Sequence, residues 1–244
     1  MEKDHYRLIY QQEENHWWYK GMWVITESLL NQYYKDNNLN ILDAGCGTGI
    51  NLTRLSKFGK TFGVDFSEEA LKYSKERNHK RICNSSIEFL PFKNASFDLV
   101  TSFEVLYHSG VKDDERAIKQ FYAACKKNGR VLIRVPAFKI LFGKHDLVVH
   151  GIRRYRKNEL KDILTRAGFE IEKISYLDFF LFFPALVIRL IQRISKSEKE
   201  SDIKTTNSLL NNFLYYIFKF ESYYLKKFNF PFGISLLCIA RKGK

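Results

Sequence analysis

The sequence predicts an α/β protein in which a mainly parallel β-sheet is covered by helices. Short runs rich in β-branched and aromatic residues alternate with helical stretches, which is typical of strand–helix–strand units. A chain of 244 residues, 45% hydrophobic and 27% charged, is also large enough and apolar enough for one globular core. We therefore expect a single domain.

The expected elements follow one another with short connections. Strands are predicted at 39–45, 60–66, 80–86, 97–103, 129–136, 169–177 and 233–241, with helices near 49–58, 67–78, 113–127 and 157–167. Ser67 is the expected N-cap of the second of these helices, because acidic residues follow it in the first turn. Gly168 is expected to end the fourth.

The domain divides into five expected segments. These are an N-terminal helical lid (1–37), a ligand-binding core (38–136), a loop, helix and sixth strand (137–177), an apolar and aromatic helical insertion (178–232) and the last strand (233–244). The apolar run that opens the insertion is roughly half of the ~20 residues that a membrane-spanning helix needs. The insertion is therefore not expected to cross a bilayer.

Cysteine content and charge exclude several classes of protein. The four cysteines form no C-x-x-C pair, which argues against a zinc site and a disulfide framework, and we expect no metal. The net charge of +13 suits nucleic acid, anionic lipid or a phosphorylated substrate. Nucleic acid is disfavoured because the basic residues form no long run. The polar, acidic start differs from a secretory signal, so a cytoplasmic location is expected.

A glycine-rich turn, LDAGCGTG at 42–49, follows the first predicted strand. Glycines at 45, 47 and 49 allow a tight turn and let a ligand approach the backbone. Ile50 stands where a dinucleotide-binding fingerprint would place its third glycine, which weighs against NAD. Asp65 ends the second strand, where a carboxylate can accept hydrogen bonds from a ribose diol. The pair indicates an adenosine-type ligand.

Five segments in register resemble the successive motifs of class I S-adenosylmethionine-dependent methyltransferases. They are LDAGCGTG, GVDFSEEAL, EFLPFKNASFDLV, EVLYH and KKNGRVLIRVP, and together they cover 40–136. The resemblance implies a Rossmann-like sheet of seven strands in the order 3-2-1-4-5-7-6, with the last strand antiparallel and helices on both faces. It also implies S-adenosylmethionine as cofactor and S-adenosylhomocysteine as product.

The resemblance further implies which residues bind the cofactor. They are Asp43, Gly45, Cys46, Gly47 and Gly49 at the methionine moiety, Asp65 at the ribose, Phe66, Ser86 and Ile87 at the adenine, and Phe103 and Glu104 beside the methyl group. Trp17, Trp18 and Tyr19 either form a lid over the cofactor or pack an N-terminal helix onto the sheet.

Two flanking segments resemble a narrower subgroup, whose members are often associated with surface-polysaccharide or lipid-linked glycan pathways. HWWYKGMW (16–23) resembles its HWWF-x-x-RR opening, and HDLVVHGIRRYRKNEL (145–160) resembles its HD-x-x-x-GH-x-RRY segment. Met22 and Trp23 stand where basic residues are usual, so no salt bridge from them to the cofactor carboxylate is expected.

Proton removal from the acceptor is the variable part of such a reaction, because the sulfonium is already an activated electrophile. The candidate catalytic residues are His108, His145, His150 and Tyr155. The candidate acceptor-binding residues are Asp146, Arg153 and Arg154, since an arginine pair can clamp a phosphate or carboxylate. Structural roles for all of these residues stay open.

The sequence favours methyl transfer to an O or N atom of a small-molecule or lipid-linked glycan acceptor. The alternatives are an RNA or protein methyltransferase and a non-catalytic cofactor-binding or membrane-docking module. Segments 179–194 and 213–228 suit a membrane interface at the inner membrane face, core packing or a dimer contact. The oligomeric state stays open.

Overall fold

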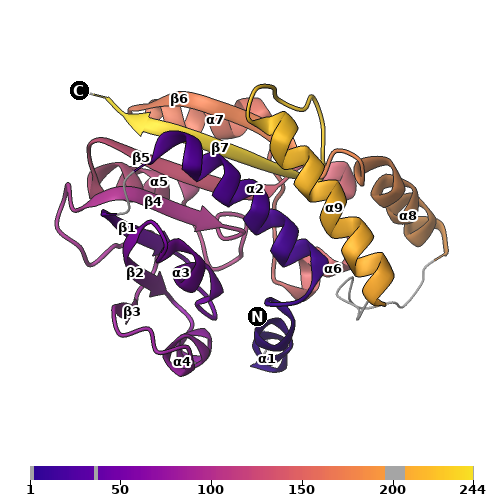
Figure 1. Cartoon of the computed structure of the whole chain (residues 1–244), viewed down its shortest axis with the longest axis horizontal. Helices are drawn as coiled ribbons and strands as arrows, with labels where there is room; N and C mark the ends of the chain where they lie inside the picture. Colours follow the sequence, from indigo (N-terminus) through magenta and orange to yellow (C-terminus); the bar gives the residue numbers. More distant parts are fainter. Residues whose placement is uncertain (1–2, 36–37, 196–206, 244) are drawn as a thin grey trace.

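The computed structural model describes residues 3–35, 38–195 and 207–243. Seven strands form one sheet in the order β3-β2-β1-β4-β5-β7-β6 (Figure 1). The strands are β1 (Leu39–Ala44), β2 (Gly59–Asp65), β3 (Ile82–Asn84), β4 (Phe97–Phe103), β5 (Cys125–Pro136), β6 (Phe169–Leu177) and β7 (Ser235–Lys242). Only β7 runs antiparallel to its neighbours, β5 and β6. The predicted fold class and strand order are confirmed.

Helices cover both faces of this sheet. They are α1 (Lys3–Gln12), α2 (Trp17–Tyr33), α3 (Ile50–Leu55), α4 (Glu68–Glu76), α5 (Asp114–Ala124), α6 (Lys144–Val148), α7 (Lys157–Arg166), α8 (Phe182–Ser195) and α9 (Ser208–Leu225), with a 3₁₀ turn at Lys139–Leu141. Figure 1 shows α2 and α9 crossing one face, while α5 and α7 lie on the other. The Ser67 hydroxyl accepts from the Ala70 N–H, and Gly168 ends α7 with φ +102°, as predicted.

The central strands are apolar because both of their faces are covered. Leu99 and Val100 of β4 and Leu132 and Ile133 of β5 are almost fully buried. A parallel sheet between two helical layers needs such continuous hydrophobic runs. The carboxyl ends of β1, β2, β4 and β5 lie at one edge of the sheet because these strands are parallel. Polar residues follow the strands at this edge.

Several helix and strand boundaries differ from the predicted ones because strand pairing determines where these elements begin and end. Helix α5 ends at Ala124, short of the predicted 127, and β5 begins at Cys125 because Cys125 pairs with Phe97 of β4. Helices α1 and α6 had not been individually predicted. The expected strand at 80–86 is reduced to residues 82–84, the only part that pairs with β2. These differences come from tertiary contacts that local propensity does not encode.

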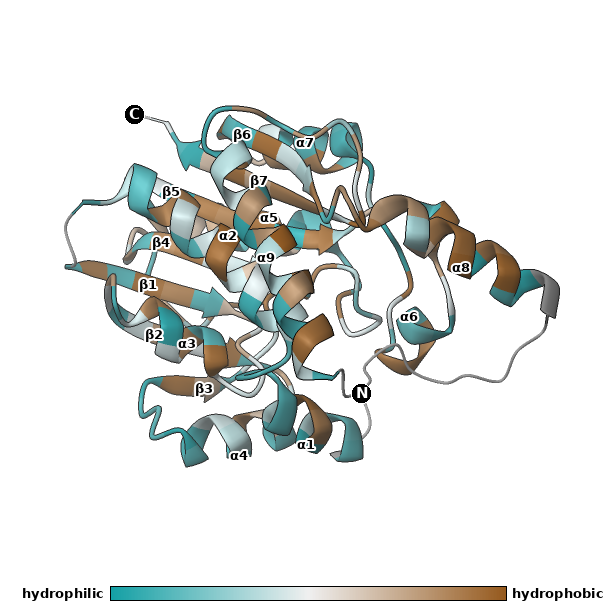
Figure 2. Ribbon diagram, turned by 45° about the vertical axis from the view of Figure 1, so that its right-hand side comes forward, coloured by the Kyte–Doolittle hydropathy of each residue, from teal (hydrophilic) through white to brown (hydrophobic). Residues whose placement is uncertain are grey.

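The insertion between β6 and β7 forms the two helices α8 and α9, whereas the polar stretch 196–206 lies outside the described residues. Helix α9 packs along α2, and a Cβ added at Gly21 of α2 would lie 2.4 Å from Cγ of Phe218. Helix α8 projects from the body of the molecule and contacts the 3₁₀ turn at Lys139–Leu141 (Figure 2).

Candidate active site

A cavity of about 420 Å³ lies where β1, β2, β4 and β5 end and α1, α2, α6 and α8 surround them. Its volume is in the range of small-molecule and cofactor sites. Of the predicted site residues, those that line it are Tyr19, Gly45, Cys46, Gly47, Asp65, Phe66, Ser86, Ile87, Phe103, Glu104, His108, His145, Asp146 and Arg154. Asp43, Gly49, His150, Arg153 and Tyr155 do not line it.

The glycine loop opens its backbone to the cavity. A Cβ added at Gly47, where φ is +54°, would meet no atom within 4 Å. Gly45, at φ +88°, instead touches the Val105 side chain, where a Cβ would approach to 2.3 Å. The loop therefore needs glycine at 45 for close packing and offers space for a ligand at 47.

Asp65 lies at the end of β2 with its carboxylate fixed by two backbone donors. Its Oδ2 accepts from the Gly47 N–H and its Oδ1 from the Ser67 N–H, each at 2.9 Å. Burial raises the pKa of this carboxyl, and these hydrogen bonds oppose the shift. Each oxygen keeps acceptor capacity, so the arrangement fits a ribose diol.

Asp43 ends β1 directly before the glycine loop and is almost fully buried. Its Oδ1 accepts from the Thr101 hydroxyl at 2.7 Å, whereas its Oδ2 is buried and has no hydrogen-bond partner among the described residues. Burial raises the pKa of Asp43 to about 7. Buried polar atoms without a partner are rare in folded proteins, and this one lies two residues before Gly45, although Asp43 itself does not line the cavity.

The residues implied for adenine form an apolar side of the cavity. Phe66 is 53% exposed, whereas Ile87 is buried. An exposed phenylalanine at the end of β2 offers a face on which a base can stack. Together with Asp65 and the open backbone at Gly47, these residues fit S-adenosylmethionine.

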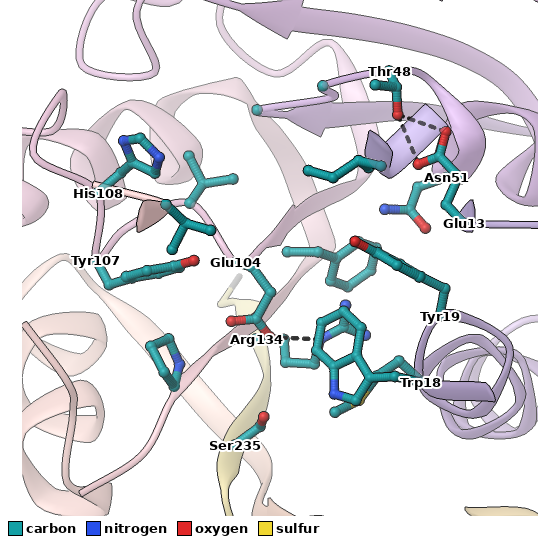
Figure 3. Close-up of a pocket in the computed structure, with 18 of the residues that line it drawn as sticks. Glu13, Trp18, Tyr19, Thr48, Asn51, Glu104, Tyr107, His108, Arg134 and Ser235 are labelled. Atoms are coloured by element: carbon teal, nitrogen blue, oxygen red, sulfur yellow. Dashed lines mark hydrogen bonds and ion pairs between the residues drawn. The ribbon is translucent and has the colours of Figure 1, made fainter. Parts of the chain in front are cut away.

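The N-terminal helices close the cavity from the side opposite the sheet. The Glu13 carboxylate accepts from the Thr48 hydroxyl at 2.7 Å (Figure 3). It also pairs with Arg77 at 3.0 Å. Arg54 donates to the backbone carbonyls of Glu13 and Tyr19. These contacts hold α1 and α2 over the glycine loop, in keeping with a lid formed by Trp17, Trp18 and Tyr19.

An ion pair that the sequence did not predict lies at the centre of the cavity. Arg134 of β5 donates from Nε to Oε1 of Glu104 at 2.9 Å (Figure 3). Its guanidinium also lies over the Phe103 ring, 4.9 Å from the centroid. The sequence did not predict site roles for four further residues that line the cavity, Glu13, Arg54, Tyr107 and Arg134. Tyr107 and Arg134 lie within the EVLYH and KKNGRVLIRVP motifs, whereas no motif contains Glu13 or Arg54.

The three candidate histidines lie in different surroundings. His108 and His145 line the cavity, and the His108 ring lies 6.3 Å from that of Phe66. Burial lowers the pKa of His108 to about 4, so its imidazole is neutral at physiological pH. His150 does not line the cavity, and its ring lies 6.1 Å from that of His108.

The structure corrects the expectation for the arginine pair and Tyr155. Arg154 forms a two-point ion pair with the buried Asp146, at 2.9 and 3.1 Å. Arg153 pairs with Asp114 at 2.7 Å, away from the cavity. The Tyr155 hydroxyl donates to the Leu106 carbonyl and contacts Asp114 at 2.7 Å. These groups hold the 145–155 segment against the sheet, so the two arginines do not form an acceptor clamp.

Comparison with known proteins agrees with this geometry. Residues 42–133 match the family model of a methyltransferase domain. An uncharacterized protein of Methanocaldococcus jannaschii is 28% identical over 69% of this chain and 76% of its own length. A Mycolicibacterium smegmatis protein named "Probable S-adenosylmethionine-dependent methyltransferase" is 23% identical over 65% of this chain and 62% of its own length.

Solved structures share the fold. The methyltransferase in a complex with the Haloferax volcanii Trm112 methyltransferase activator superposes with a TM-score of 0.64 at 14% identity, covering 98% of both chains. The motifs in register, the strand order, the cofactor-sized cavity and the family match all agree. The family match and the named relatives support a class I S-adenosylmethionine-dependent methyltransferase, with residues 42–133 as its methyltransferase domain.

Proposed function

We propose that the enzyme transfers the methyl group to an O or N atom of a lipid-linked acceptor at the inner face of a membrane. The observation that carries this proposal is the extent of the cavity, which runs from the glycine loop to Ala185 and Arg189 of α8. The region beyond the cofactor-binding residues is thus bordered by an apolar helix.

The outward side of α8 is apolar. Phe183, Val187, Ile188 and Ile191 are each more than half exposed. Their spacing places 183, 187 and 191 along one helical face, while Ala185 and Arg189 line the cavity. A helix with an apolar outer face beside a cavity suits an acceptor whose lipid stays in the bilayer.

Helix α9 carries a second exposed apolar stripe, interrupted by lysines. Leu209, Phe213, Tyr216, Phe220 and Tyr223 recur at helical spacing and are each at least 60% exposed. Lys219 lies 5.9 Å from the Tyr216 ring centroid, and Lys226 lies 5.5 Å from that of Tyr223. Aromatic side chains with nearby cations suit the headgroup region of an anionic bilayer.

The proposed contact is peripheral. No helix in the described part of the chain is long and apolar enough to span a bilayer. The surface charge of a protein with a net charge of +13 favours anionic over neutral lipid, and binding should weaken as salt rises.

Vesicle flotation tests the membrane contact. The full chain, with S-adenosylhomocysteine present, should float with phosphatidylglycerol-containing vesicles and much less with pure phosphatidylcholine. The double variant Ile188→Glu and Ile191→Glu should lose most of this binding, because it places two charges on the apolar face. Phe89→Glu is the control, since Phe89 is 56% exposed and lies neither on α8 nor among the residues that line the cavity. Equal flotation of both variants would contradict the proposed surface.

Methyl transfer is tested with tritium-labelled S-adenosylmethionine and vesicles that contain a polyprenyl diphosphate-linked saccharide. Label should enter the organic phase with the wild-type chain and fall at least tenfold with the α8 double variant. If the wild-type chain and the α8 double variant transferred label only to a water-soluble saccharide, and at equal rates, this would argue against a lipid-linked acceptor.

A further inference from the structure

We propose that Glu104 is the catalytic base that removes a proton from the acceptor, and that Tyr107 and Tyr19 orient the acceptor above it. The inference rests on the proposed methyl transfer to an acceptor O or N atom, and it holds whether or not that acceptor carries a lipid.

Backbone geometry places Glu104 beside the cofactor loop. It follows β4 in a left-handed conformation, with φ +57°, and its N–H donates to the Arg134 carbonyl at 2.9 Å. The next residue, Val105, packs directly on Gly45. A non-glycine residue with positive φ costs conformational energy, which the surrounding structure must offset. The effect here is to turn the Glu104 side chain into the cavity.

Only one oxygen of the Glu104 carboxylate is committed to a protein partner. Oε1 accepts from Arg134, whereas Oε2 accepts no hydrogen bond from a described residue. The Glu104 side chain is 19% exposed and lines the cavity. The second oxygen is therefore available to an acceptor O–H or N–H, while Arg134 fixes the orientation of the carboxylate.

Two phenols converge on the same space. Figure 3 shows the Tyr107 hydroxyl pointing toward Glu104, and the Tyr19 hydroxyl pointing into the cavity from the opposite side. Neither hydroxyl bonds to a described residue, although both side chains line the cavity. Burial raises the pKa of both phenols, so they stay neutral and can donate hydrogen bonds to an acceptor oxygen.

The electrostatic surroundings suit a base at Glu104. Burial raises its pKa, Arg134 and Arg154 oppose this shift, and Asp146 adds to it. A carboxyl with a raised pKa is a stronger base, nearer the operating pH. His108 is the weaker candidate because burial lowers its pKa to about 4 and its ring contacts Phe66 on the adenine side.

The step balances without a further reactant. The acceptor oxygen or nitrogen attacks the methyl carbon, and the carbon–sulfur bond breaks with its electron pair staying on sulfur, which gives neutral S-adenosylhomocysteine. Oε2 of Glu104 takes the proton that the acceptor loses, and this proton passes to water when the products leave. The substrate hydroxyl or amine becomes the methyl ether or methylamine.

The test compares Glu104→Gln with a matched control, Glu172→Gln, which alters a Glu–Arg pair on the sheet surface. Methyl transfer is measured with labelled S-adenosylmethionine and the vesicle-borne polyprenyl diphosphate saccharide. We expect Glu104→Gln to lower kcat at least 100-fold while the Kd for S-adenosylhomocysteine changes less than threefold. The wild-type and Glu172→Gln kcat should rise with pH along an acidic limb, because the base must be ionised, and this limb should vanish in Glu104→Gln.

A kcat within threefold of wild type, or a loss of S-adenosylhomocysteine affinity as large as the loss of kcat, would overturn the assignment. Absence of transfer by the wild-type chain would instead count against the proposed acceptor. In that case the protonation of the Glu104 carboxyl is tested by infrared titration of the complex with S-adenosylhomocysteine. The difference between wild type and Glu104→Gln should contain a carboxyl band that titrates above the ordinary glutamate range; a band at or below that range contradicts the proposal.

Discussion

Asp178 and Glu221 are two buried carboxyl groups that lie outside the cavity and join the insertion to the sheet. Glu221 of α9 accepts from the Asp178 and Phe180 backbone N–H groups at 2.9 and 3.3 Å. Both side chains are almost fully buried. Burial raises the pKa of Glu221 to about 7, and burial together with the nearby Glu221 charge raises that of Asp178.

This pair should make folding stability depend on pH. Between the ordinary glutamate value of 4.5 and about 7, the folded state binds a proton that the unfolded state has released. The free energy of unfolding should therefore fall as pH rises through this window. Glu221→Gln keeps an acceptor oxygen without the charge, so urea unfolding from pH 4.5 to 8 should show a smaller decline than in wild type. An equal decline in both chains would contradict this role.

Single residues were predictable from the sequence only where a motif fixes their backbone position. Asp65 lies at the end of β2 and faces the cavity, as its distance from the glycine loop indicated. Tyr155 and Arg153 had equally suggestive types, but their partner Asp114 lies about 40 residues away in sequence. Which group a polar side chain reaches depends on such distant contacts, and a local pattern does not contain them.

The contact between α2 and α9 links the N-terminal lid to the insertion. Gly21 allows the two helices to approach, because Phe218 is fully buried against it. Asn211 of α9 also accepts from the Trp17 N–H at 2.8 Å, at the start of α2. The position of Trp17 and its neighbours over the cavity thus depends on a helix nearly 200 residues later in the chain.

Gly21→Ala should destabilise the protein by about 1–3 kcal/mol, which is typical of overpacking and larger than alanine's helix-propensity gain of about 1 kcal/mol. The reason is the 2.4 Å approach of the new Cβ to the Phe218 ring. Urea unfolding followed by circular dichroism measures this. Asn31→Ala, at an exposed site on the same helix, is the control. A Gly21→Ala chain as stable as the control would show that α9 moves aside without cost.

Most elements were predictable because hydrophobic runs, caps and glycines agreed. The strand at 169–177 and the strand at 97–103 have the predicted bounds. The boundaries of elements differ from the prediction where strand pairing determines them, as at Cys125, which pairs with Phe97 of β4. The insertion helices were expected from composition, but the packing of α9 on α2 and the proximity of α8 to the cavity depend on the assembled fold.

The molecule combines a methyltransferase domain at the sheet with helices that lie outside the family match. The sheet edge supplies the cofactor loop, Asp65 and Glu104, while α1, α2, α6 and α8 supply the remaining walls of the cavity. The family match covers residues 42–133 and none of these four helices. Acceptor choice should therefore be determined by the accessory helices, and methyl donation by the sheet.

The central claim is that this sheet edge binds S-adenosylmethionine and that Asp65 holds its ribose. Isothermal titration of the full chain with S-adenosylhomocysteine tests it most directly, with Asp65→Ala and the exposed Asp162→Ala as a matched pair. Wild type and Asp162→Ala should bind alike, and Asp65→Ala should bind at least tenfold more weakly, since each hydrogen bond to a charged group contributes about 1.5–3 kcal/mol. Absence of binding by the wild-type chain, or unchanged affinity in Asp65→Ala, would contradict the account.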